Sequence, residues 1–125
     1  MASVKSYIKQ RFYSSSIRTE QYITFEKQCK RELKQQCEKF GIKIHKFLPN
    51  HFEWSAVLEK DNKFVYVRIS DVRFWDWYND ILIRTMKHDS DWRGGSNNTC
   101  SFDMIGSMAD KLFNEQKNEL NYHFK

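Results

Sequence analysis

The 125-residue sequence has little of what marks membrane, disulfide-rich or disordered chains. It contains one proline, four glycines and three cysteines, and its mean hydropathy is −0.78. No run of uncharged apolar residues is long enough for a membrane-spanning helix, and three cysteines without a CxxC pair do not describe a disulfide framework. The first twelve residues also lack the apolar stretch of a secretory signal. We therefore expect reduced thiols and a location in the cytosol.

Apolar and aromatic side chains are plentiful. Hydrophobic residues make up 40% of the chain and aromatic residues 16%, which is enough to bury a core, and the length suits a single domain over residues 1–125. The net charge of +5 is unevenly spread, since residues 1–50 carry +7 and the remainder −2. A basic field of this kind attracts nucleic acid or an acidic protein surface.

The clearest predicted element is a long N-terminal helix over Thr19–Phe40, which Gly41 ends. Its apolar stripe comprises Tyr22, Phe25, Cys29, Leu33, Cys37 and Phe40. Eight residues separate the two cysteines, about 12 Å along a helix, so they are predicted core thiols rather than a disulfide. The opposite face is either merely solvated or binds nucleic acid, and it carries Lys27, Lys30, Arg31 and Lys34. A short helix is expected before it, at residues 4–12.

After Gly41 the hydrophobic period changes to two, which predicts strands at 42–48, 52–58 and 63–70. Pro49-Asn50 and Asp61-Asn62 are the predicted turns. Residues 81–86 fit a fourth strand or a short helix, 87–100 a long polar loop, and Ser101 is the expected cap of a closing helix at 102–120. The predicted fold is therefore α+β, an antiparallel three- to four-stranded sheet with the N-terminal and C-terminal helices packed on one face.

Motifs for catalysis are weak. His88, Asp89 and Asp91 share one loop and could hold a divalent ion that activates water, but their spacing matches no known nuclease. No phosphate-binding loop or nucleophile elbow occurs. We predict no enzyme, no cofactor and no metal, while a structural zinc held by His45 with His51, or by His88 with Cys100, stays open.

Aromatic residues and arginines crowd residues 73–97, and Trp, Tyr and Arg are the residues that dominate protein interfaces. The predicted partner contacts are Arg73, Trp75, Tyr78, Arg84, Trp92, Arg93, Asn97 and Asn98. In the alternative interpretation, Phe74 and Trp77 fill the core and Trp75 or Trp92 covers its rim.

The expected order of one helix, three strands and one helix is also that of the double-stranded-RNA-binding domain. That domain grips phosphates with a lysine cluster at the start of its last helix. The corresponding stretch here has no lysine before Lys111. The likeness is therefore one of element order only.

Two segments, Tyr13–Leu33 and His51–Asn97, carry a family resemblance, with ISDVR and YNDILIRT…GGSN as its most specific parts. They resemble a group of small proteins carried by phages and mobile elements of low-GC Gram-positive bacteria, some of which are anti-CRISPR proteins that inhibit Cas9. The resemblance implies a protein of the bacterial host cytosol that binds a CRISPR effector nuclease directly and sterically blocks guide or target nucleic-acid loading. It assigns no functional residues.

Many Cas9 inhibitors imitate DNA through strong negative charge, which a chain at +5 cannot do as a whole. This chain would instead bind a recognition or nuclease lobe, or use the local acidic strip Asp71–Asp91. The alternative function is a nucleic-acid-binding module that uses the basic face of the first helix.

Overall fold

The structure is a computed structural model that describes residues 4–7, 20–50, 53–69, 72, 76–91 and 96–123. The elements are, in order, η1 (Val4–Tyr7), α1 (Glu20–Glu38), β1 (Lys43–Asn50), β2 (Glu53–Lys60), β3 (Lys63–Arg68), β4 (Ile81–Met86), β5 (Asn98–Cys100), η2 (Phe102–Met104) and α2 (Ile105–His123). The predicted α+β class is confirmed. Neither α1 nor α2, as far as the structure describes them, is long and apolar enough to cross a membrane.

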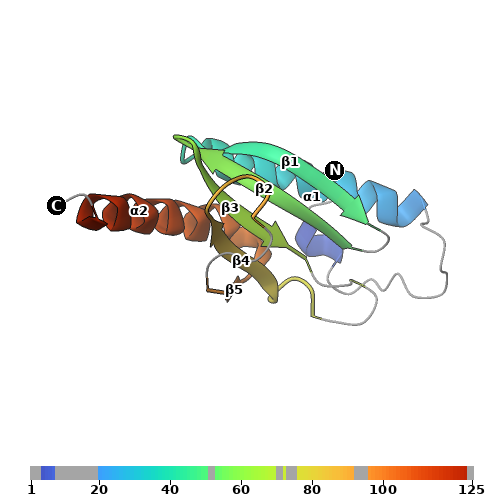
Figure 1. The fold of residues 1–125 in the computed structure, drawn as a ribbon. Helices are drawn as coiled ribbons and strands as arrows, with labels where there is room; N and C mark the ends of the chain where they lie inside the picture. The colour runs from blue at the N-terminus through green and yellow to red at the C-terminus, as the bar shows by residue number, and fades with distance from the viewer. Residues whose placement is uncertain are drawn as a thin grey trace.

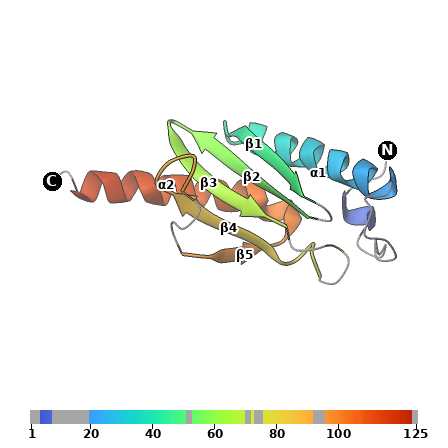
Figure 2. The ribbon, with the colours of Figure 1, turned by 45° about the vertical axis from the view of Figure 1, so that its right-hand side comes forward.

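The five strands form one antiparallel sheet in which each strand pairs with the next along the chain. Both helices lie behind the sheet, α1 along the β1 side and α2 behind β3 and β4 (Figures 1 and 2). The other face of the sheet carries no helix among the described residues. The fold therefore has two layers, and its core lies between them.

Several details of the prediction are wrong. The sheet has five strands rather than three or four, because Ile81–Met86 is a strand and Asn98–Cys100 adds a fifth inside the expected loop. Pro49 and Asn50 continue β1 and pair with Trp54 and Glu53 instead of turning. Of the short helix expected at residues 4–12, the structure describes the 3-10 helix η1 over Val4–Tyr7, and the rest lies outside the described residues.

Two turns follow directly from the residues that make them. Gly41 has a φ of +69° just after α1, the left-handed conformation that ends helices and that glycine adopts without strain. Asp61 and Asn62 have φ values of 52° and 64° between β2 and β3. This conformation is that of a type I′ hairpin turn, which Asn and Asp tolerate and which matches the twist of the strands. The predicted turn at these residues is confirmed.

The predicted stripe of the first helix forms one side of the core. Tyr22, Phe25, Cys29 and Leu33 are fully buried against the sheet, and Phe40 packs at its edge. Cys29 and Cys37 are free buried thiols, as predicted. Burial raises the pKa of Cys37 to about 12 and that of the half-buried Cys100 to about 11, so both stay protonated and unreactive at neutral pH.

The two helices meet through Gln36 and Gly106. The side-chain amide of Gln36 donates to the carbonyl of Phe102 at 2.8 Å, and its oxygen accepts from the backbone N–H of Gly106 at 2.9 Å. The expected cap by Ser101 is wrong, because Ser101 precedes η2 and its hydroxyl bonds to Asp103 rather than to a backbone N–H. A residue from α1 therefore caps the start of α2.

Candidate functional site

The candidate site is the sheet face opposite the helices, here called the open face. Side chains alternate between the two faces of a strand, and Val57, Tyr66 and Arg84 are direct cross-strand partners on β2, β3 and β4. The residues that flank them, such as Val67 and Ile83, belong to the buried core on the helix side. The pairing register thus gathers Val57, Tyr66 and Arg84 at the middle of the open face, where Val57 is fully buried and Tyr66 and Arg84 are half-buried.

Tyr66 and Arg84 form the centre of this face. The guanidinium carbon of Arg84 lies 4.7 Å from the centroid of the Tyr66 ring, within the range of a cation–π contact. Both side chains are half-buried, and the Nε atom of Arg84 is fully covered. The pair therefore presents a flat ring and a guanidinium that are already held in place, which lowers the entropy cost of using them in an interface.

A shallow depression of about 170 Å³ adjoins Tyr66 at one end of the open face. It is lined by Leu48, Glu53, Trp54, Ser55, Tyr66 and Arg68. Leu48 is 40% exposed, one of two large hydrophobic side chains so exposed in the described chain. Arg68 donates to both carboxylate oxygens of Glu53 at 3.0 and 3.2 Å, and this hydrogen bonding raises the pKa of Arg68. The end of the face thus combines apolar surface with a fixed polar rim.

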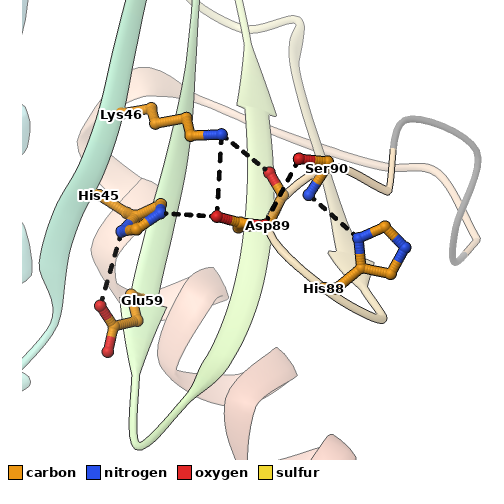
Figure 3. Close-up of polar contacts among 6 residues, drawn as sticks. All are labelled: His45, Lys46, Glu59, His88, Asp89 and Ser90. Carbon is orange, nitrogen blue, oxygen red and sulfur yellow. Dashed lines mark hydrogen bonds and ion pairs between the residues drawn. The ribbon is translucent and has the colours of Figure 1, made fainter.

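The segment after β4 crosses the other end of the open face (Figure 3). Asp89 follows β4, yet its carboxylate lies 3.1 Å from Nε2 of His45 and 3.8 Å from Nζ of Lys46, both on β1. His45 also lies 3.7 Å from Glu59 through its other ring nitrogen. Because β2 and β3 separate β4 from β1, these contacts hold the segment across the sheet. We call the set of His45, Lys46 and Asp89 the latch.

The side chains that suggested a nuclease site point to different partners. Asp89 belongs to the latch, His88 accepts from the backbone N–H of Ser90 at 3.2 Å, and Asp91 accepts from that of Lys87 at 2.9 Å. Within the described parts of the chain, no group of three or more His, Cys, Asp or Glu is arranged to hold a metal ion. His51, one of the residues considered for zinc, lies outside the described residues.

The predicted contact residues are not gathered in one place. Arg84 lies on the open face, whereas Asn97 is exposed beside β5 and Asn98 begins that strand. Tyr78 is only 7% exposed and packs against Trp77 and Phe102, so little of its ring is available to a partner. Burial also raises its pKa. The other four, Arg73, Trp75, Trp92 and Arg93, lie outside the described residues, as does Phe74.

The alternative interpretation of the aromatic cluster is correct for Trp77. Its ring is 3% exposed and lies 4.9 Å from that of Phe25 in the core. The basic residues of the first helix, Lys27, Lys30, Arg31 and Lys34, are all exposed on α1 and lie apart from the open face.

Sequence reasoning missed Tyr66, Arg68 and Leu48. Side chains alternate along a strand, so Phe64 and Tyr66 share one face of β3, which is a usable signal. Alternation does not show that Tyr66 faces Arg84. That pairing depends on the register between β3 and β4, which 12 intervening residues separate in the chain.

No protein-family model, curated protein or solved structure matches this chain.

The first testable prediction concerns the latch. The hydrogen bond from His45, supported by the charge of Lys46, holds the pKa of Asp89 below its ordinary value. Because the pKa of Asp89 is lower in the folded chain than in the unfolded chain, the latch stabilises the fold at pH values above the ordinary aspartate pKa. This stabilisation is lost as the pH falls through the lowered pKa. Carboxyl NMR of Asp89 should show the depressed midpoint, and His45→Ala should move it upward. An unchanged midpoint in His45→Ala would contradict the assignment of His45 as the main cause.

Proposed function

We propose that this chain is an inhibitor that binds a CRISPR effector nuclease, Cas9, directly through the open face and sterically blocks guide or target nucleic-acid loading. The observation that carries the proposal is the Tyr66–Arg84 pair beside the depression, on a sheet face that no helix of the described residues covers. Tyr and Arg at the centre of a patch are the residues that supply most of the free energy of protein binding.

The choice of Cas9 rests on the resemblance of Tyr13–Leu33 and His51–Asn97 to phage and mobile-element proteins. The net charge of +5 disfavours imitation of DNA by the whole surface. The proposed contact is therefore a protein surface, a recognition or nuclease lobe of the effector, which the inhibitor covers. Steric inhibition needs only tight binding, so we propose that the chain acts without turnover, in the cytosol of the bacterial host.

The remaining predicted contacts are proposed from their positions in the chain. Trp92 and Arg93 follow Asp91 directly in the chain, and the latch holds the preceding Asp89 across the open face. Asn97 is exposed beside β5, next to β4 in the sheet. We keep Arg73, Trp75, Trp92 and Arg93 as proposed contacts, together with Arg84 and Asn97. Asn98 pairs with the core residue Ile83, so the strand register directs its side chain to the helix side of the sheet rather than to the open face. Tyr78 is left as a core residue.

The test is a pull-down of purified Cas9, with and without guide RNA, combined with a DNA-cleavage assay. We expect binding to at least one of the two forms and inhibition that is complete near one inhibitor per effector. Binding to Cas9 alone would favour a block of guide loading, and binding to the guide complex alone a block of target loading.

Two results would contradict the proposal. One is the absence of binding to either form of Cas9. The other is cleavage of DNA or RNA by the chain alone in Mg²⁺ or Mn²⁺ that disappears in Asp89→Ala or Asp91→Ala, because that would make the protein a nuclease.

A further inference from the structure

Three lysines form a straight row on one flank of α1. Lys27, Lys30 and Lys34 are all exposed, and their spacing of three and four residues places them one above another along about 10 Å of helix. We call these three residues the lysine row. The spacing alone did not separate them from Arg31, which is exposed on the same helix.

The structure shows which way the row faces. Nζ of Lys30 lies 5.5 Å from the centroid of the Phe47 ring on β1, so this flank of α1 borders β1, the strand at the edge of the sheet. Figure 2 shows α1 running beside that edge. Arg31 instead donates to the side-chain oxygen of Gln28 at 3.1 Å, which turns it away from β1. Arg31 is therefore directed away from the edge that Lys30 borders.

The charge of the row is not neutralised by its neighbours. Among the residues that the structure describes, no carboxylate lies within ion-pairing distance of Lys27, Lys30 or Lys34. Glu26 on the same helix is buried, and Glu32 accepts hydrogen bonds from the N–H of Val4 and from Gln28. The row thus lies in the half of the chain that carries +7 and keeps its full positive charge.

The edge of β1 discourages a peptide from adding as a sixth strand. Pro49 has no backbone N–H to donate, and the pairing register of β1 shifts between Ile44 and Lys46. Proline, bulges and lysines are the features by which edge strands avoid pairing with other chains. A lysine ammonium group, in contrast, binds a phosphate as a point charge, without any pairing of backbone hydrogen bonds along the strand.

We propose that the lysine row binds the phosphate backbone of a nucleic-acid strand that lies along the α1–β1 edge. The three ammonium groups are spread over about 10 Å of helix, and each can contact one phosphate, so the row neutralises about three phosphates. This site lies apart from the open face, and the proposal does not depend on Cas9 inhibition.

The test measures binding of the full chain to a fluorescent 20-nucleotide single strand and to the 20-base-pair duplex by anisotropy at several salt concentrations. Binding of the row should release about three counterions. The slope of the logarithm of the affinity against the logarithm of the salt concentration should therefore be steeper by roughly 2 for the single strand and roughly 3 for the duplex. Replacing Lys27, Lys30 and Lys34 together with Gln should remove that part of the slope. All three side chains are exposed, so circular dichroism should be unchanged.

Arg31→Gln and Lys111→Gln are the matched controls, since each removes one exposed charge from a helix outside the row. Both should leave the slope nearly as in the parent chain. The proposal is overturned by undetectable binding at 50 mM salt, by a triple variant with the parental slope, or by an Arg31→Gln variant that loses about a third of the slope lost in the triple variant. The proposal would also be overturned, in favour of an acidic peptide as the ligand, if polyglutamate bound as tightly as the oligonucleotide and the triple variant lost that binding.

Discussion

Replacing Tyr66 with alanine should weaken binding to Cas9 about thirtyfold or more, and Arg84→Ala should have a similar effect. Anchor residues at the centre of an interface cost about 2 kcal/mol or more when truncated, which corresponds to that factor. Because the two side chains contact each other at 4.7 Å, removing either one also frees the other from its held position. Isothermal titration or surface plasmon resonance against purified Cas9 measures the loss.

The coupling between the two residues gives this prediction its control. The double variant should lose less affinity than the sum of the two single losses, because residues in contact are not independent. Tyr66→Phe keeps the ring under Arg84 and should retain most of the affinity, and Lys111→Ala on the exposed side of α2 should retain all of it. Full affinity in a folded Tyr66→Ala/Arg84→Ala variant would contradict the assignment of the open face.

The second large effect is expected on stability, where α1 meets α2. A Cβ atom added at Gly106 would lie 3.0 Å from both the Cβ and the backbone oxygen of Gln36, closer than such atoms approach without movement. Gly106→Val should therefore push the helices apart and lower the free energy of unfolding by about 2 kcal/mol or more. For a chain of this size that is a fall in Tm of roughly 6–10 °C, measurable by thermal denaturation.

Gln36→Ala tests the other half of the same contact. It leaves the N–H of Gly106 and the carbonyl of Phe102 without their side-chain partner, which costs about 1–3 kcal/mol. Gln35→Ala and Ser107→Ala alter the exposed neighbours of the two residues and should change stability by less than about 0.5 kcal/mol. Equal stability of Gly106→Val and the parent chain would show that the helices do not approach as described.

The strong periodicities of the sequence predicted the main elements, and the weak local signals did not. The stripe from Tyr22 to Cys37 identifies α1 because five positions agree on one face, and Asp61-Asn62 identifies a hairpin because few residues accept its backbone conformation. Pro49 is a common turn residue, but an edge strand tolerates it because its missing N–H faces no partner. The three residues of β5 are too few to show a period at all.

The candidate site was harder to predict because it depends on register. Arg84 was singled out for its residue type, but only the β3–β4 pairing shows that it lies over Tyr66. Tyr78 was singled out by the same criterion, yet the hydrogen bond between its carbonyl and the N–H of Phe102 places it at the start of η2, where its ring is buried. Composition alone cannot separate an arginine on an open sheet face from a tyrosine in the core.

The most direct test of the proposed function is the footprint of Cas9 on this chain, measured by hydrogen–deuterium exchange of the complex against the free protein. We expect the strongest protection in β3, β4 and the β1–β2 residues around the depression, with little change in α2. Protection confined to the helix layer, with β3 and β4 exchanging as in the free protein, would contradict the account.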